Sequence, residues 1–274
     1  MLDPVAQNAL DSNGSGSGTV TGGASVLVNS KHASSAARTS GGGSLTAPRF
    51  QVTGGTVGTC NGVVETGVPP TPDPLAYLPL PSVPPDGKMT QTGIGNGNKR
   101  YVLSPGRYRN LPNFNVGDEV VLRQASAGND GIFFIDGGGF TSTGANITMD
   151  PTTSGGVMIY NNPANASSSQ GINISGNAAG TVNLSALTSG TYAGLLFFQN
   201  RVAGQSMSVS GNGSFTLKGT FYLAKALLQV TGNGTATIGS QYISRFLSMG
   251  GGGAVTIDYT DDGTARTRVI SLVE

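Results

Sequence analysis

A repeating pattern of short apolar stretches separated by glycine corners is the feature that most constrains this chain. Segments such as 172–177 and 207–212 alternate apolar and polar residues and then end in Ser-Gly-Asn. Alternation of this kind places the apolar side chains on one face of a strand. The corner residues Gly211, Gly232 and Gly251 recur about 20 residues apart, a spacing typical of a solenoid in which each coil holds two or three strands.

Glycine and asparagine suit such corners because both tolerate positive φ, and stacked asparagine side chains can hydrogen-bond along the solenoid. The chain lacks the strict six-residue apolar period of a left-handed solenoid. We therefore predict an all-β chain folded as a right-handed parallel β-helix, or β-solenoid. An antiparallel β-sandwich or jelly roll stays open as the alternative, because strands spaced about 8–12 residues apart fit it as well.

Some stretches carry more apolar residues than one buried face requires. Leu195, Leu196, Phe197 and Phe198 are consecutive, so alternation along a strand would place two of them on each face. The run 132–135 (Ile-Phe-Phe-Ile) shows the same surplus. Because a large exposed apolar patch is adhesive, we expect the outer face to be covered by a surface segment of the same chain or by a neighbouring subunit.

Residues 67–87 are rich in proline and must be largely extended, with polyproline II character. An exposed linker between two lobes is one interpretation. The side chains of Leu75, Tyr77, Leu78 and Leu80 are too apolar for a solvated tether, so we predict an extended strap on the surface of the fold. The expected organisation is N-terminal solenoid coils in 1–66, the strap or linker in 67–87, and the main solenoid in 88–274.

Composition argues against several classes of protein. Charged residues make up 11% of the chain and the net charge is +1, so there is no electrostatic footprint for nucleic acid or an anionic membrane. No apolar run approaches the roughly 20 residues of a membrane helix. The first residues show no signal peptide, so we expect either a cytosolic protein or a mature or partial chain. The single cysteine, Cys60, rules out an internal disulfide and favours a free thiol.

Residues that can carry catalysis are sparse. A glycosidase needs two carboxylates within about 5–10 Å, but the acidic residues are scattered apart from the cluster in 258–263. That cluster is typical of a turn ended by Asp-Gly, and whether Asp258, Asp261 and Asp262 bind a cation stays open. The single histidine, His32, has no cysteine nearby and indicates neither a metal site nor a catalytic triad. We predict no catalytic residue, no metal site and no cofactor.

Several segments together resemble one known family. Segments 101–106 (Tyr-Val-Leu-Ser-Pro-Gly), 172–177 and 192–201 (Tyr-Ala-Gly-Leu-Leu-Phe-Phe-Gln-Asn-Arg) occur in this order, after the proline-rich 72–79. They resemble the C-terminal region of bacterial tight-adherence (Tad) pilus-associated proteins, the TadG-like group, over nearly the whole chain. The resemblance implies an envelope or cell-surface location and no established enzymatic activity. This sequence departs from the family in showing no N-terminal membrane helix and in having Asn200 where members tend to have Asp.

These observations predict a structural, non-enzymatic protein that lies outside the bacterial cell or on its surface. We expect it to self-associate end to end or side by side into a fibre or a pilus-associated structure, because no convincing cap covers either end and segment 266–273 is a bare alternating strand. The alternatives are a surface adhesin or carbohydrate-binding module that uses exposed Tyr and Asn, and a polysaccharide lyase or hydrolase.

The expected partners are further copies of this chain, surface glycans or pilus components, with no nucleic acid and no membrane span in this chain. The residues predicted for self-association or packing are Leu75, Tyr77, Leu78, Leu80, Phe133, Leu196, Phe198, Val269 and Leu272.

Overall fold

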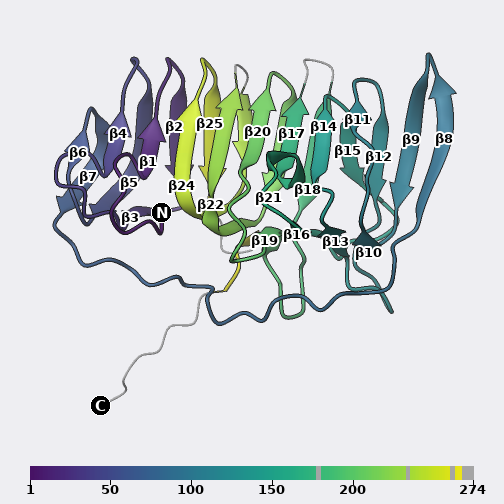
Figure 1. The fold of residues 1–274 in the computed structure, drawn as a ribbon. Coiled ribbons are helices and arrows are strands. Elements are labelled where there is room, and N and C mark those ends of the chain that lie inside the picture. The colour runs from purple at the N-terminus through teal and green to yellow at the C-terminus, as the bar shows by residue number, and fades with distance from the viewer. Residues whose placement is uncertain (177–179, 233–234, 260–262, 267–274) are drawn as a thin grey trace.

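The computed structural model is all-β, and its short strands stack into an elongated body (Figure 1). It describes residues 1–176, 180–232, 235–259 and 263–266. The one short helical element named in these residues is a 3-10 turn, Ser168–Gln170. No helix among them is long and apolar enough to cross a membrane.

The strands are β1 (Leu10–Ser12), β2 (Ser17–Thr21), β3 (Ser25–Val28), β4 (Ala37–Thr39), β5 (Ser44–Val52), β6 (Thr56–Val57), β7 (Cys60–Thr66), β8 (Met89–Gly95), β9 (Asn98–Leu103), β10 (Gly106–Tyr108), β11 (Phe114–Asn115), β12 (Glu119–Leu122), β13 (Ile132–Asp136), β14 (Phe140–Thr143), β15 (Asn146–Met149), β16 (Met158–Asn162), β17 (Ile172–Gly176), β18 (Thr181–Ser185), β19 (Leu195–Gln199), β20 (Met207–Gly211), β21 (Ser214–Lys218), β22 (Thr220–Gly232), β23 (Thr235–Ile238), β24 (Gln241–Gly250) and β25 (Ala254–Asp258).

These strands form three parallel ladders. Ladder I runs β9-β12-β15-β18-β21-β23-β25-β2 and continues in the first halves of β5 and β7. The second half of β5 pairs with β3 on one side and with the second half of β7 on the other. Ladder II runs β10-β13-β16-β19 and continues in the first halves of β22 and β24. Ladder III runs β11-β14-β17-β20, the second halves of β22 and β24, then β1, β4 and β6.

The chain visits the three ladders in turn, as in β12, β13 and β14, before it returns to ladder I at β15. Every pairing between the named strands is parallel except that of β8 with β9, which form an antiparallel hairpin at one end (Figure 1). Long parallel sheets with this connectivity are compatible with a β-solenoid. They do not fit the alternative, an antiparallel sandwich or jelly roll.

The N-terminal strands stack directly on the last strands of the chain. In ladder I, β2 pairs with β25, so that Thr19 lies opposite Thr256. In ladder III, β1 pairs with β24, and Leu10 lies opposite Leu247. Next to the first half of β24, which belongs to ladder II, the Leu2 amide donates to the Ser244 carbonyl at 2.8 Å. The strands of residues 1–66 and those of residues 88–258 therefore share one stack, and β1 and β2 meet β24 and β25 in its middle.

Residues 67–87 run back along this stack from the β7 end to the β8 end (Figure 1). They are fixed near β3 by the paired hydrogen bonds of Asn29 with Thr71, at 2.7 and 2.9 Å. Near the far end, Asp86 forms a bridge with Arg107 of β10. A polyproline II segment of this length reaches about 65 Å, which exceeds the roughly 43 Å that the ten strands of ladder I span at 4.8 Å spacing. We call this segment the strap.

The main apolar core lies between the ladders and is lined with aromatic rings. Phe114 and Phe140 have ring centroids 5.5 Å apart, and Phe197 and Phe221 have centroids 4.8 Å apart. Strict alternation along β19 would group Leu195 with Phe197, but Leu196 and Phe197 both lie in the main core. A register shift between Leu195 and Phe197, where β19 pairs with β22, accounts for the difference. The expectation of two apolar side chains on each face nevertheless holds, because Leu195 and Phe198 face outward.

A column of glycines forms the corner between ladders III and I. Gly176, Gly211 and Gly232 lie opposite one another in successive strands. A Cβ on Gly211, whose φ is +112°, would lie 1.9 Å from the Gly176 carbonyl oxygen, and one on Gly251 would lie 2.2 Å from the Gly232 oxygen. The recurring glycines of the sequence are thus required by close backbone approach.

Replacing Gly211 with alanine should destabilise the fold by about 3 kcal/mol or more, because positive φ and a backbone clash act together. Gly42→Ala is the matched control, since Gly42 also has positive φ, +84°, but nothing lies within 4 Å of its Cβ position. It should cost only about 1 kcal/mol. Chemical unfolding of both variants tests this, and equal losses would contradict the stacked corner.

Candidate functional site

A second apolar cluster lies on the outer face of ladder II, beneath the strap. Its buried residues are Leu75, Leu78, Ile132, Phe134, Met158, Tyr160, Leu187, Leu195, Phe198, Tyr222, Ile243 and Ala265. Leu75 and Leu78 come from the strap, and most of the others come from β13, β16, β19 and the first halves of β22 and β24. The apolar surplus of the sequence is therefore covered, over this face, by the chain itself.

Arg201 anchors the strap to this cluster. Its Nη2 donates to the carbonyl oxygens of Leu75 at 2.9 Å and Leu78 at 2.7 Å, and its Nε donates to the Tyr222 hydroxyl at 2.7 Å. The guanidinium carbon also lies 5.4 Å and 5.3 Å from the ring centroids of Phe198 and Tyr222. One side chain thereby bonds the two strap carbonyls beside the buried leucines and packs over the aromatic cluster.

Tyr222 links the same anchor to Asp73 of the strap. Its hydroxyl donates to Asp73 Oδ2 at 2.6 Å. Burial, reinforced by the hydrogen bond to the Asp73 carboxylate, raises the pKa of Tyr222, so the phenol stays protonated and able to donate. Burial likewise raises the pKa of Tyr160 to about 12. Both effects favour a structural role for these phenols over an acid–base role near neutral pH.

A polar column runs along the C-terminal ends of the ladder II strands. The Asn162 side chain donates to Asp136 Oδ1 at 3.0 Å, and the Asn200 side chain donates to Asn162 Oδ1 at 2.8 Å. Beside this column, the buried Asn161 side chain donates to the buried Gln199 side chain at 3.1 Å. The sequence pattern predicted stacked asparagines at the Gly-Asn corners, but these ones lie where β13, β16 and β19 end.

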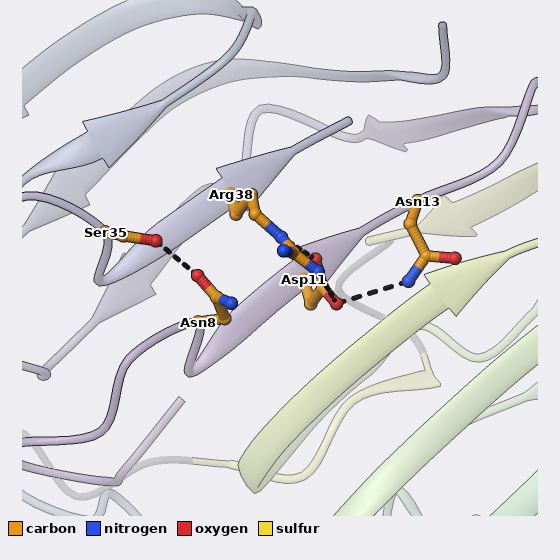
Figure 2. Close-up of polar contacts among 5 residues, drawn as sticks. All are labelled: Asn8, Asp11, Asn13, Ser35 and Arg38. Atoms are coloured by element: carbon orange, nitrogen blue, oxygen red, sulfur yellow. Dashed lines mark hydrogen bonds and ion pairs between the residues drawn. The ribbon is translucent and has the colours of Figure 1, made fainter. Parts of the chain in front are cut away.

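Two ion pairs hold the N-terminal strands in place. Arg38 of β4 donates to both carboxylate oxygens of Asp11 in β1, each at 2.8 Å, and Asn13 donates to the same carboxylate at 3.2 Å (Figure 2). Those hydrogen bonds from Arg38 lower the pKa of Asp11. Figure 2 also shows Ser35 donating to Asn8 beside them.

The second pair joins Asp3, near the first residue, to Arg245 of β24 at 2.8 Å. Burial alone would raise the pKa of Asp3. Hydrogen bonds from the Val5 and Ala6 amides and from Arg245 outweigh that effect and lower it.

The residues predicted for self-association or packing fall into separate environments. Leu75, Leu78 and Phe198 meet in the strap-covered cluster, whereas Phe133 and Leu196 lie in the main core. Tyr77 and Leu80 of the strap are 41% and 45% exposed. Val269 and Leu272 lie outside the described residues.

The polar candidates of the sequence are used within the fold. His32 Nδ1 accepts a hydrogen bond from the Ser35 amide at 3.2 Å, and Asp258 accepts one from the Thr21 hydroxyl at 2.8 Å. Asp261 and Asp262 lie outside the described residues. Cys60 is a half-buried free thiol whose pKa is raised by burial.

The carboxylates of the described residues are also engaged. Glu65 and Glu119 pair with Arg49 and Arg100, and buried Asp118 accepts the Lys99 and Asn115 amides, each at 2.8 Å. The remaining acids with a bonded carboxylate are Asp3, Asp11, Asp73, Asp86, Asp130, Asp136, Asp150 and Asp258. Within 1–176, 180–232, 235–259 and 263–266, no three His, Cys, Asp or Glu side chains are grouped to hold a metal ion.

Unpaired strand edges are the other candidate for function. β7 pairs with β5 on one side, and among the described strands nothing pairs with its other side. Val63 and Val64 in β7 are 57% and 40% exposed. Val64 lies opposite Phe50, which is fully buried. The same position is therefore covered in β5 and exposed in β7, where no further strand follows among the described residues. At the opposite end, β8 pairs only with β9, and all of its residues are exposed.

Comparison with known proteins does not extend these observations. No family model matches the chain, and neither a curated protein nor a solved structure matches it significantly.

The sequence pattern does not indicate that Arg201 anchors the strap. Removing this side chain tests the anchor directly. Arg201→Ala should free the strap, because two strap carbonyls and the Tyr222 hydroxyl lose their donor. We expect local opening to become easier by about 3 kcal/mol, so that chymotrypsin cleaves after Tyr77 about 100-fold faster. Mass spectrometry of the fragments measures the rate.

Arg109→Ala is the matched control, because Arg109 also pairs with the strap, through Asp86 at 3.6 Å, but is 54% exposed. Its loss should change the opening by less than about 1 kcal/mol. Equal cleavage rates in the two variants would contradict the anchoring role of Arg201.

Proposed function

We propose that this chain is a structural protein of the bacterial cell surface, folded as a right-handed parallel β-helix that self-assembles through its ends into a fibre. No catalysis is involved in this function. Strength along the fibre comes from main-chain hydrogen bonds that run parallel to its axis. The surface location and an association with pili rest on the resemblance to the TadG-like group.

The unpaired edge of β7 is the observation that carries the proposal. Natural sheets blunt their edges with charge, proline or a covering segment, because a bare edge pairs with another chain. β7 presents Val63 and Val64 to solvent, and its one charged side chain, Glu65, is paired with Arg49 of β5. Val57 of β6 is exposed as well. An edge of this kind is a template for a further strand.

The opposite end offers a matching partner. β8 belongs to the same sheet as β7 and has its own free edge among the described strands. Because β7 is parallel to its neighbour and β8 is antiparallel to its neighbour, β7 of one copy would meet β8 of the next in an antiparallel pair. Such a head-to-tail contact uses two different surfaces, and it produces an open filament unless the rotation closes a ring.

The engagement of the described carboxylates supports a mechanical role over an enzymatic one. A lyase or hydrolase needs carboxylates free to transfer protons or to meet the substrate. Here they bond arginines, amides and hydroxyls of the fold itself.

A second candidate is an adhesive or carbohydrate-binding face on ladder I. Thr216, Thr237, Thr256, Thr19 and Thr46 lie opposite one another in successive strands. They form a column of partly exposed hydroxyls that continues across the pairing of β2 with β25. Hydroxyls repeated at about 4.8 Å can hydrogen-bond a repeating polymer. We rank this candidate second because Tyr77 is the one aromatic among the large apolar side chains exposed in the described residues.

Electron microscopy over a range of protein concentrations tests fibre formation. We expect filaments with a single axial repeat from the unaltered chain. Val64→Lys should raise the concentration needed for assembly about tenfold or more, because a charged edge opposes strand pairing. Val202→Lys is the control, since Val202 is 77% exposed and follows β19 away from both ends. Discrete monomers at every concentration would overturn the proposal.

A further inference from the structure

A cavity of about 380 Å³ lies at the corner where the chain passes from ladder I to ladder II. Two connections supply most of its lining: the one from β12 to β13, with Asp130, and the one from β18 to β19, with Tyr192. Gly155, from the β15–β16 connection that lies between them in the stack, lines it as well. The volume falls within the range of sites that hold small ligands.

Hydrogen bonds of the fold hold both connections in place. Ser126 and Asn129 exchange two backbone hydrogen bonds, each 3.0 Å long, which close the first connection into a tight turn. In the second connection, the Gly194 amide donates to the Leu187 carbonyl at 2.7 Å. A cavity whose walls are fixed in advance loses little conformational freedom when a ligand binds.

Asp130 and Tyr192 bring unused hydrogen-bonding groups to this cavity. Asp130 Oδ1 accepts the Ile132 amide at 3.0 Å, whereas no group in the described part of the chain bonds its Oδ2. The ring centroid of half-buried Tyr192 lies 6.2 Å from that of Phe198. Nothing in the ranges that the structure describes bonds the Tyr192 hydroxyl.

The two side chains are close enough to interact electrostatically. Burial raises the pKa of Tyr192, and the Asp130 charge adds to this effect against the opposing charge of Arg201. The phenol therefore stays protonated and able to donate. A donor and an acceptor thus line the same cavity without a hydrogen bond between them.

We propose that this cavity binds one unit of a neutral sugar, with a sugar hydroxyl placed between Tyr192 and Asp130. A hydroxyl can accept a hydrogen bond from the phenol and donate its own proton to the carboxylate, whereas an ammonium group can only donate. An anionic ligand is disfavoured, because Asp130 alone is charged among the described residues that line the cavity.

The rest of the lining suits the remainder of a sugar unit. Further hydroxyls come from Ser126, Ser189 and Thr191, and apolar surface comes from Ile132 and Leu187. None of the lining residues belongs to β7 or β8, so the proposal does not depend on fibre formation. The site also differs from the threonine column of ladder I, which lies on strands rather than on connections.

Saturation-transfer NMR with the methyl glycosides of glucose, galactose and mannose tests the site. We expect at least one of them to bind the full chain with millimolar affinity. Asp130→Asn should weaken that binding about tenfold or more, because Oδ1 keeps the Ile132 amide and the new amide nitrogen cannot accept the sugar proton. Tyr192→Phe should weaken it about tenfold as well, because it removes the donor and keeps the ring beside Phe198.

Asp150→Asn is the matched control. Asp150 Oδ1 likewise accepts the amide two residues on, that of Thr152, at 3.0 Å, but Asp150 does not line the cavity, so the affinity should not change. The anionic methyl glycoside of glucuronic acid and the cation propylammonium should bind about tenfold more weakly than the neutral glycoside, or less tightly still.

Three results would overturn the proposal. One is that none of the three neutral glycosides binds. Another is that the glucuronic acid glycoside or propylammonium binds as tightly as the neutral glycoside. The third is that Asp130→Asn or Tyr192→Phe leaves the affinity at the level of Asp150→Asn.

Discussion

Main-chain hydrogen bonds between successive parallel strands are the interaction on which the rest of this structure depends. They fix the register that brings Gly211 opposite Gly176 and Asn162 opposite Asp136. The columns of glycine, asparagine and threonine follow from that register. A slip of one residue would turn the core side chains outward. The columns also make such a slip costly, because a Cβ cannot enter the glycine corner.

The second constraint is the apolar surplus on ladder II. A strand with two apolar faces needs cover on both, and the strap supplies the outer cover with Leu75 and Leu78. The strap also connects the two ends of the stack, since it follows β7 and precedes β8. Its polyproline character helps here, because an already extended segment loses little conformational freedom when it docks. Arg201 then binds it, with the guanidinium packed over the rings of Phe198 and Tyr222.

Much of this architecture could be predicted from the sequence. Short alternating stretches with glycine corners indicated an all-β fold, and the parallel ladders agree with the predicted type of pairing. The runs at Leu195–Phe198 and Ile132–Ile135 indicated that a second face needed cover. The remaining features depend on contacts between residues far apart in the chain. The alternating stretches resemble one another, so the pattern does not reveal that β2 stacks on β25. Nor does it reveal which carbonyls Arg201 binds, because they lie more than 120 residues away. The bulge at Leu195 exchanges the faces of two side chains and leaves no signature in the alternation.

The pairing of β2 with β25 joins the two parts of the chain into one stack. An engineered crosslink tests this pairing most directly. Thr19 lies opposite Thr256, at the roughly 4.8 Å spacing of neighbouring strands, which permits a disulfide. In a Cys60→Ser background, Thr19→Cys with Thr256→Cys should therefore crosslink within one chain on oxidation. Thr19→Cys with Asp258→Cys is two residues out of register, at about 8 Å, and should not crosslink. Crosslinking of both pairs alike, or of neither pair in the folded protein, would contradict the continuous stack.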